Sequence, residues 1–314
     1  MRVIVTGAGG FIGGVLVRRL LEHGLAGQRV QALVAVDLSL QGLPDDARLQ
    51  RVSGSIADAG VQERSLAERV DAVFHLASMP GGAAENAPDQ GRRVNLDATA
   101  HLLSLLREQG TRPRFVFAST VAVYGHPLPE LVDEHTPPRP ALSYGAHKLA
   151  AEVLVADAAR RGWVDACSLR LPGVVARPGD GAGLVSAFMS QLFWKLAAGE
   201  PIVLPVSADG ETWWISVGAC VDNLLRAATI DTTRLDPRRV VQMPALHLPI
   251  RSVIDALAQV HGPERRALVR HEPQEMVQRL FASYPPLHTP QALALGFCHD
   301  GTADGLVRRA LALS

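Results

Sequence analysis

The sequence predicts an α/β fold in which a doubly wound parallel sheet is followed by a smaller carboxyl-terminal lobe. Apolar, β-branched runs alternate with helical patterns up to residue 172, and this alternation is typical of parallel strands joined by helical crossovers. A glycine-rich turn directly follows the first run. The alternation stops at residue 173, where proline and glycine become frequent.

Six apolar runs are expected to form the strands of the sheet. Strands of a parallel sheet are covered on both faces, so they are apolar on both sides. The six runs cover residues 3–6, 32–37, 49–53, 72–76, 115–119 and 166–171. In the second half, helical segments are expected near residues 184–198, 218–228 and 250–260, without a matching series of strands.

The stretch VTGAGGFIGG is expected to form a strand, a tight turn and a helix. Apolar residues recur at helical spacing from Phe11 onward. A helix amino terminus offers unpaired backbone N–H groups and the positive end of a dipole, and glycine lets a diphosphate approach both closely. Because residue 12 is isoleucine, the spacing fits GxxGxxG rather than GxGxxG. The glycines that fit are Gly7, Gly10 and Gly13. A plain strand-to-helix turn is the alternative interpretation of the glycines alone.

Asp37 ends the second apolar run and decides between these interpretations. A carboxylate at this position can accept hydrogen bonds from both ribose hydroxyls of an adenosine, and it repels a 2′-phosphate. The glycines and Asp37 together predict a dinucleotide site that takes NAD rather than NADP.

The composition excludes several classes of partner. The 314 residues include 31 Lys plus Arg and 31 Asp plus Glu, so no basic surface for nucleic acid or acidic membranes is expected. Three widely separated cysteines argue against a disulfide framework or a zinc site. The chain enters its first strand without a charged leader, and no apolar run reaches membrane-spanning length. We therefore expect a soluble cytoplasmic protein.

The break in the alternation predicts two domains. We expect residues 1–172 to form the nucleotide-binding domain, with residues 217–240 returning to it. Residues 173–216 and 241–314 are expected to form the second lobe. Ligands of doubly wound folds bind at the carboxyl edge of the sheet, and we expect this lobe to close over that edge.

The stretch SYGAHKLAAE places Tyr144 and Lys148 four residues apart at the start of a helical pattern, hence on one face. An ammonium near a phenol favours the phenolate and lowers the phenol's pKa from about 10 toward neutral pH. A phenolate can take the proton of an alcohol while hydride leaves the same carbon. A half-buried ring beside a solvated amine would give the same spacing, so the pair alone leaves both interpretations open.

The stretch FVFASTVAVYG adds hydroxyl groups, because this strand is expected to end at Ser119 and Thr120. A hydroxyl at the carboxyl end of a central strand can orient a substrate oxygen and stabilise charge that develops there. Together with the glycines and Asp37, the set of Thr120, Tyr144 and Lys148 resembles the pattern of the extended short-chain dehydrogenase/reductases, which modify sugars. The stretches HLAS, VNLDAT and RLPGVVARPG match the same family. The resemblance covers essentially the whole chain and implies a Rossmann fold with a substrate-binding lobe.

The resemblance implies a role for each matching residue. Tyr144 would be the acid/base, Lys148 would also hold the nicotinamide ribose, and Thr120 would orient the substrate oxygen. His75 and Asn95 are expected to support local packing. The residues implied around the cofactor are Gly7, Gly10, Phe11, Ile12, Gly13, Asp37, Leu76, Ala77, Ser78, Tyr144, Lys148, Pro172, Val174 and Val175.

Within this family, four stretches of the chain look most like the corresponding stretches of enzymes that oxidise short sugar acids. They are HLASMPGGAAENA, VFASTVAVYG, LSYGAHKLAAEVL and LRLPGVVARPG. The sugar-nucleotide epimerases usually carry asparagine at the place of Gly173, where it helps to bind the substrate diphosphate. Thr212 stands where an arginine is expected in the sugar-acid enzymes, so we expect Arg177 to pair with the carboxylate; an arginine that bridges the lobes is the alternative. The other expected substrate contacts are Ser78, Ser119, Thr120, Tyr144, Trp213 and Trp214. The two tryptophans could instead seal the lobe interface.

Three functions follow from these patterns. The first is an NAD-dependent dehydrogenase that oxidises a sugar acid of four to six carbons at the hydroxyl beside its carboxylate. The second is a sugar-nucleotide epimerase or dehydratase, and the third is an NAD sensor without turnover, against which the intact Thr, Tyr and Lys set argues. The expected partners are a small-molecule substrate and a second copy of the chain through a helical interface.

Overall fold

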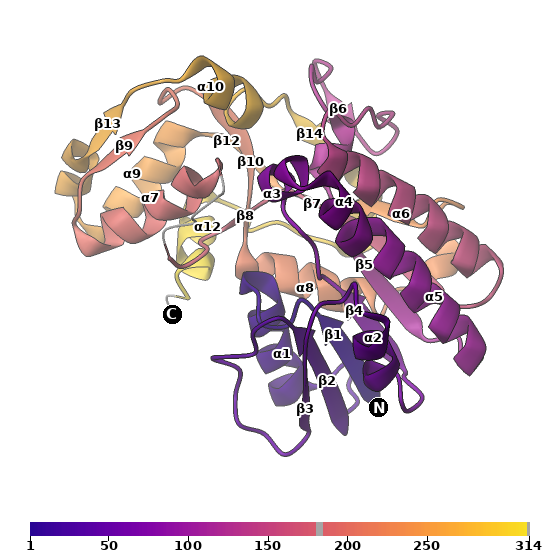
Figure 1. Ribbon diagram of the computed structural model, residues 1–314. Helices are drawn as coiled ribbons and strands as arrows, with labels where there is room; N and C mark the ends of the chain where they lie inside the picture. Colours follow the sequence, from indigo (N-terminus) through magenta and orange to yellow (C-terminus); the bar gives the residue numbers. More distant parts are fainter. Residues whose placement is uncertain (180–184, 313–314) are drawn as a thin grey trace. The chain divides into compact units, whose positions relative to one another are not determined.

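The structure, a computed structural model, describes residues 1–179 and 185–312 and divides into two compact units (Figure 1). Unit 1 comprises Met1–Gly125, Pro137–Leu171 and Val221–Gln242. Unit 2 comprises His126–Thr136, Pro172–Cys220 and Met243–Ser314. The predicted start of a helix at residue 184 lies outside the described residues.

Unit 1 is built on a seven-stranded sheet with the strand order β11-β7-β5-β4-β1-β2-β3 (Figure 1). Every neighbouring pair in this sheet is parallel. The strands are β1 (Arg2–Thr6), β2 (Ala32–Asp37), β3 (Leu49–Ser53), β4 (Ala72–His75), β5 (Arg114–Thr120), β7 (Asp165–Leu171) and β11 (Val240–Gln242). The predicted fold class is confirmed, and each of the six predicted strands ends within one residue of its observed bounds.

The sequence did not predict the seventh strand, β11. It is three residues long and directly follows Arg238 and Arg239, so it has neither the length nor the apolar periodicity that mark a strand. Its place is set by tertiary pairing, because Val240 to Gln242 lie opposite Ser168 to Arg170 of β7.

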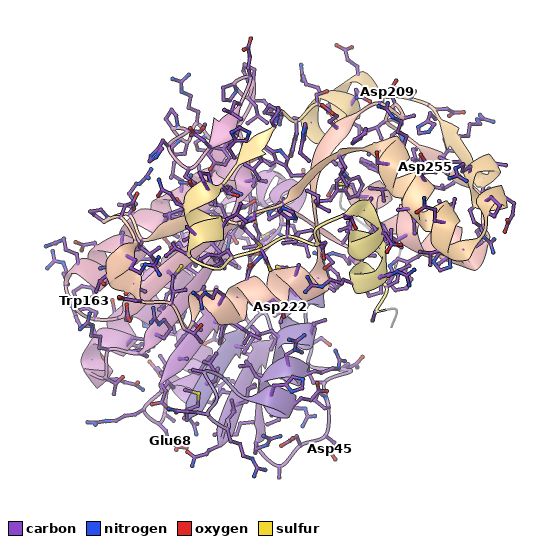
Figure 2. The ribbon with its side chains drawn as sticks, turned by 180° about the vertical axis from the view of Figure 1, so that it is seen from behind. Asp45, Glu68, Trp163, Asp209, Asp222 and Asp255 are labelled. Carbon is purple, nitrogen blue, oxygen red and sulfur yellow. The ribbon has the colours of Figure 1, made fainter. Side chains whose placement is uncertain are left out.

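Helices cover the sheet, as the alternation of side chains along its strands requires. Ile4, Val73 and Phe115 pack with α2, α5 and α6 in one buried cluster. The helices of unit 1 are α1 (Phe11–His23), α2 (Ala59–Ser65), α3 (Gly81–Asn86), α4 (Pro88–Arg92), α5 (Ala98–Gln109) and α6 (Ser143–Arg160), with the π-helical η1 (Arg93–Asp97) and the 3₁₀ turns η2 (Val121–Tyr124) and η3 (Thr232–Arg234). Helix α8 (Val217–Ala227) enters unit 1 at residue 221. Its Asp222, labelled in Figure 2, accepts a hydrogen bond of 2.9 Å from Arg19 of α1.

The strand order reverses between β1 and β4. Strands β2 and β3 lie on one side of β1, whereas β4, β5 and β7 lie on the other. The connections after β1 and β4 therefore diverge at the carboxyl edge, and ligands of doubly wound sheets bind in the crevice that results.

Unit 2 contains short strands and five helices among its described residues. The strands form a three-stranded sheet, β12-β10-β8, and the pairs β13-β9 and β14-β6. They are β6 (Val132–Asp133), β8 (Gly173–Val175), β9 (Ile202–Leu204), β10 (Glu211–Ser216), β12 (Leu246–Pro249), β13 (Val269–His271) and β14 (Leu287–His288). The helices are α7 (Ala187–Ala198), α9 (Ile250–His261), α10 (Glu275–Phe281), α11 (Pro290–Ala294) and α12 (Ala303–Ala310), with the 3₁₀ segment η4 (Pro263–Leu268).

The predicted helices of the second half correspond to α7, α8 and α9. The expectation that this half lacks a series of strands was incomplete, because its strands are two to six residues long and follow no regular crossover pattern. Within residues 1–179 and 185–312, no helix is both long enough and apolar enough to span a bilayer.

Candidate active site

The glycine turn after β1 is packed too closely for side chains. Gly7 has φ +73°, and a Cβ added to it would lie 2.8 Å from the backbone N of Ala77. A Cβ on Gly13 would lie 2.0 Å from the carbonyl oxygen of Gly7, and one on Gly9 would lie 1.8 Å from that of Ser39. The backbone of the turn therefore packs closely against its neighbours at the amino terminus of α1, as the GxxGxxG pattern predicts. Gly9, outside that pattern, is equally constrained.

Asp37 lies at the end of β2, beside this turn. Its Oδ2 accepts a hydrogen bond of 2.9 Å from the backbone N–H of Gly9, and its Oδ1 accepts one of 2.7 Å from Leu38. These bonds fix the carboxylate next to the glycines and leave further lone pairs available, because a carboxylate has about four acceptor positions.

His75 ends β4 and is held on both sides. Its Nδ1 lies 2.7 Å from the hydroxyl of Thr6, and its Nε2 lies 3.0 Å from the hydroxyl of Thr99. Burial, with a smaller contribution from the charge of Lys148, lowers the pKa of His75 to about 3. The imidazole is therefore neutral at physiological pH and has the packing role expected for it.

The segment after β4 is fixed by Asn95, which lies in η1. Its side-chain oxygen accepts a hydrogen bond of 2.7 Å from the backbone N–H of Met79, and its amide donates one of 3.0 Å to the carbonyl oxygen of Met79. Ala77 donates its backbone N–H to the hydroxyl of Thr6 at 3.2 Å. These bonds hold Leu76, Ala77 and Ser78 beside the glycine turn.

Ser119 and Thr120 end β5, as predicted, and their hydroxyls have different partners. The Thr120 hydroxyl accepts a hydrogen bond of 3.1 Å from the backbone N–H of Ala122. The buried Ser119 hydroxyl donates to the carboxylate of Glu152 at 2.5 Å. Ser119 is thus already bonded inside unit 1, and its predicted contact with substrate stays a prediction.

Tyr144 lies in the first turn of α6, directly beside the segment that follows Thr120. A Cβ added to Gly145 would lie 2.5 Å from the carbonyl oxygen of Ala122, so glycine is what allows this turn to approach η2. On another side, a Cβ added to Gly81 at the start of α3 would lie 3.8 Å from the Tyr144 Cβ. The helix start and the strand end are therefore brought together by backbone packing.

Lys148 lies one turn further along α6 and is 1% exposed. Its Nζ donates a hydrogen bond of 2.8 Å to the carbonyl oxygen of Ala118, and it lies 4.7 Å from the centre of the Phe117 ring and 6.0 Å from that of Tyr144. Burial lowers the pKa of Lys148 to about 7, against the opposing effect of the Glu152 charge. The ammonium can therefore change charge near neutral pH.

The remaining predicted site residues belong to unit 2. Pro172 and Val175 are buried, and Val174 is partly exposed. Arg177 is exposed; its backbone N–H donates to Ser190 at 2.9 Å, and its carbonyl oxygen accepts from the Trp194 indole at 2.8 Å.

The tryptophans Trp213 and Trp214 lie in β10 and are fully buried. Their indole N–H groups donate to the carbonyl oxygens of Pro285, at 2.7 Å, and Leu248, at 3.1 Å. Their contact with substrate stays a prediction, as does that of Arg177.

Comparison with known proteins identifies the family. Residues 3–240 match the model of the NAD dependent epimerase/dehydratase family. The chain belongs to this family. Its cofactor is accordingly NAD, and the close-packed glycines beside the Asp37 carboxylate fit that dinucleotide.

Three similar proteins illustrate the relationship. The chain is 38% identical to a D-erythronate dehydrogenase of Cupriavidus necator, over 98% of this chain and 97% of the relative. It is 30% identical to a D-erythronate dehydrogenase of Haemophilus influenzae, over 98% of each chain. The crystal structure of a nucleoside-diphosphate-sugar epimerase from Agrobacterium tumefaciens superimposes with a TM-score of 0.92 at 32% identity, over 98% of this chain and 92% of that one.

The sequence patterns of this epimerase/dehydratase family member did not reveal two buried charged residues beside the candidate site. Glu152 lies on α6, four residues after Lys148, and Arg170 lies on β7. Two signals could have revealed them: an acidic residue at helical spacing from the lysine, and an arginine inside an apolar strand. Among the described residues, no cluster of His, Cys, Asp and Glu side chains is arranged to hold a metal ion.

Proposed function

We propose that this protein is an NAD-dependent dehydrogenase that oxidises D-erythronate, or a closely related short sugar acid, at the hydroxyl beside the carboxylate. One observation carries the proposal. Thr120, Tyr144 and Lys148 gather at the end of β5 and the start of α6, in a chain similar over nearly its whole length to two D-erythronate dehydrogenases.

The side chains of unit 1 can carry out the proton transfer. The Thr120 hydroxyl orients the substrate oxygen, and the Tyr144 phenolate takes the hydroxyl proton. Bound NAD would supply the acceptor for the hydride of the same carbon. A charged Lys148 favours the phenolate, because opposite charges nearby stabilise the ionised form. The product is the corresponding keto acid.

Unit 1 also offers the groups that would hold the dinucleotide. The backbone N–H groups around Gly10 and Gly13, at the start of α1, would bind the diphosphate. Asp37 would accept hydrogen bonds from the adenosine ribose, and Lys148 would donate to the nicotinamide ribose. Phe11, Ile12 and the segment 76–78 would line the same ligand, and Pro172, Val174 and Val175 are further candidate contacts of the cofactor.

We assign the substrate carboxylate to Arg177. A guanidinium can bind a carboxylate through two parallel hydrogen bonds. The exposed Arg177 has its backbone anchored on both sides, by Ser190 and Trp194. Ser78 and the tryptophans of β10 are further candidate contacts of the substrate.

A sugar-nucleotide epimerase is the second candidate, favoured by the name of the Agrobacterium tumefaciens structure. Gly173 argues against it. A Cβ at this position would lie 2.9 Å from the Met189 Cε and 3.0 Å from the carbonyl oxygen of Trp213. The asparagine expected there in epimerases does not fit without a shift of these neighbours. A sensor without turnover would have no use for the Thr120, Tyr144 and Lys148 set.

The test is the appearance of NADH on incubation with NAD and a panel of sugar acids, neutral polyols and nucleotide sugars. D-erythronate should be oxidised. Tyr144→Phe should lower kcat by about 100- to 10,000-fold while NAD still binds with the wild-type Kd. Conversion of UDP- or GDP-sugars with no oxidation of any sugar acid would establish the epimerase instead. Near-normal turnover by Tyr144→Phe would remove Tyr144 as the base.

We further propose that the protein is a homodimer. Val153 and Leu154 of α6 are 63% and 39% exposed, so this helix presents apolar side chains on the surface of unit 1. A second copy of the same helix could cover them. Light scattering after gel filtration should give twice the chain mass of 33.5 kDa, and a single-chain mass would refute the dimer.

A further inference from the structure

A buried ion pair joins α6 to β7 next to the candidate site. The Glu152 carboxylate accepts hydrogen bonds from the Arg170 guanidinium at 2.9 and 2.7 Å, and from the Ser119 hydroxyl at 2.5 Å. The Glu152 and Arg170 side chains are 3% and 4% exposed. These partners of the carboxylate all lie inside unit 1.

The other side of Arg170 is also fixed. Its Nη1 donates to the Tyr124 hydroxyl at 3.2 Å, and its guanidinium stacks 5.1 Å from the centre of the Tyr124 ring. The Tyr124 hydroxyl donates to the side-chain oxygen of Gln242 at 3.0 Å. The network thus spans α6, β5, β7, η2 and β11.

Stability alone gives a weak reason for such a pair. The desolvation of two buried charges commonly offsets their attraction, and apolar side chains of similar volume are often as stable. A more informative interpretation is that the pair holds a negative charge near the Lys148 ammonium, because Glu152 lies one helical turn from Lys148 on the same helix.

Three consecutive residues of β5 connect the pair to the site. Ala118 accepts the hydrogen bond of Lys148 through its carbonyl oxygen, Ser119 donates to Glu152, and Thr120 ends the strand. The Lys148 ammonium is therefore bonded to the same strand end that the Glu152 carboxylate holds. A substitution of Glu152 is therefore expected to affect both the Lys148 ammonium and the end of β5.

We propose that Glu152 and Arg170 are positioning residues for Lys148: their ion pair keeps a carboxylate charge one turn from the ammonium and sustains the charged form on which Tyr144 depends. The consequence for catalysis rests on the proposed function, whereas the effect on Lys148 does not.

The charges around Lys148 support this assignment. Tyr144 and Glu152 face it from α6, and the neutral His75 faces it from β4. Phe117 and Ala118 of β5 carry no charge, and Arg170 of β7 and Tyr124 of η2 act through Glu152. Burial lowers the pKa of Lys148, and the Glu152 carboxylate raises it, so Glu152 is the group that opposes loss of the proton.

The sequence makes a direct measurement feasible, because the chain contains two lysines, Lys148 and Lys195. Protein labelled with ¹³C at the lysine Cε should give two NMR signals, assigned with Lys148→Met. Lys195 is half-exposed and pairs with Glu200 at 2.5 Å, so its signal is an internal reference. In the cofactor-free wild-type protein, the Lys148 signal should titrate with a pKa of about 7.

Glu152→Gln should move the Lys148 titration down by about one pH unit, since removal of a nearby opposite charge shifts a pKa by about that amount or more. The matched control is Asp157→Asn, the same carboxylate-to-amide change at a half-exposed position of the same helix, which should leave the titration unchanged. If Glu152→Gln does not fold because Arg170 is left unpaired, the double variant Glu152→Gln/Arg170→Met removes both charges. Its Lys148 titration should still move down, but by less, because loss of the guanidinium charge partly offsets loss of the carboxylate charge.

In the active enzyme, the alkaline limb of the kcat/KM profile of Glu152→Gln should move to lower pH by the same interval. An unchanged Lys148 titration in the folded single or double variant would overturn the proposal and leave the pair a purely structural role. A wild-type protein that oxidises no sugar acid would refute the proposed function and leave the titration result standing.

Discussion

Gly13→Ala should damage the cofactor site, whereas Gly14→Ala, one residue later in α1, should stabilise the protein. The added Cβ at Gly13 would meet the carbonyl oxygen of Gly7 at 2.0 Å and the Cα of Ala8 at 2.9 Å, both backbone atoms. At Gly14 the nearest atom is the Arg18 Nη1, at 3.6 Å, an ordinary van der Waals contact. Both variants therefore add one methyl group to the same helix, at Gly13 against close-packed backbone and at Gly14 into a site with room for it.

The magnitudes follow from these distances. Alanine is better than glycine inside a helix by roughly 0.5–1 kcal/mol, and this gain applies to both variants. To accept the methyl group at Gly13, the turn must move by about 1 Å, and overpacking of this kind costs about 1–3 kcal/mol. Gly13→Ala should thus unfold several degrees below Gly14→Ala, since about 1 kcal/mol corresponds to roughly 2–4 °C in a domain of 150–250 residues.

NAD affinity should separate the variants further. A moved turn loses one or more backbone hydrogen bonds to the diphosphate, each worth about 1.5–3 kcal/mol when the partner is charged, so the Kd should rise about ten- to hundredfold. Thermal unfolding with and without NAD, together with calorimetric titration, measures both effects. If Gly13→Ala bound NAD with the wild-type Kd and unfolded together with Gly14→Ala, the assignment of the turn as a phosphate cradle would be wrong.

Three further changes test separate parts of the site. Asp37→Ala should weaken the binding of NAD and reduce the ratio of kcat/KM with NAD to kcat/KM with NADP. Equal or better use of NADP by the wild-type protein would refute the role of Asp37. His75 has its pKa lowered to about 3 from about 6.5 in the unfolded chain, so the unfolded state gains the proton first as pH falls. Between pH 7 and 5 the wild type should lose about 2 kcal/mol of stability that His75→Gln does not lose, and equal pH slopes in denaturant unfolding would contradict this. Arg177→Met should raise KM for sugar acids much more than for neutral polyols, whereas an equal loss on both would point to a scaffold role.

Prediction from the sequence succeeded where the signal is local. Apolar runs gave the six long strands of the central sheet, and the glycine spacing gave the turn before α1. The helical spacing of Tyr144 and Lys148 correctly indicated one helix, α6, whereas the catalytic roles of the two residues stay predictions. The buried positions of Glu152 and Arg170 could not be recognised in this way, because an ion pair between a helix and a strand depends on tertiary packing. The same holds for β11, whose three residues become a strand by pairing with β7.

The substrate side is less accessible to sequence patterns for another reason. Trp213 and Trp214 are consecutive in β10, so their side chains point to opposite faces of the strand. Both are nevertheless fully buried, and both indoles donate to backbone carbonyl oxygens. Adjacent tryptophans in a sequence do not reveal whether a pocket or a core surrounds them. Their neighbours come from segments more than thirty residues away, Pro285 and Leu248.

The path of the chain between the units constrains how the protein is made. The chain passes from one unit to the other after residues 125, 136, 171, 220 and 242. Strand β11 therefore leaves the ribosome only after residues 172–239, roughly 3–14 seconds after β7 at bacterial or eukaryotic elongation rates. Until then, the outer edge of β7 presents unpaired backbone N–H and C=O groups, which can pair with a strand of another chain. A nascent chain that has reached residue 171 is consequently an aggregation-prone intermediate, and completion of the cofactor-binding sheet must wait until residues 172–220 of unit 2 have been synthesised.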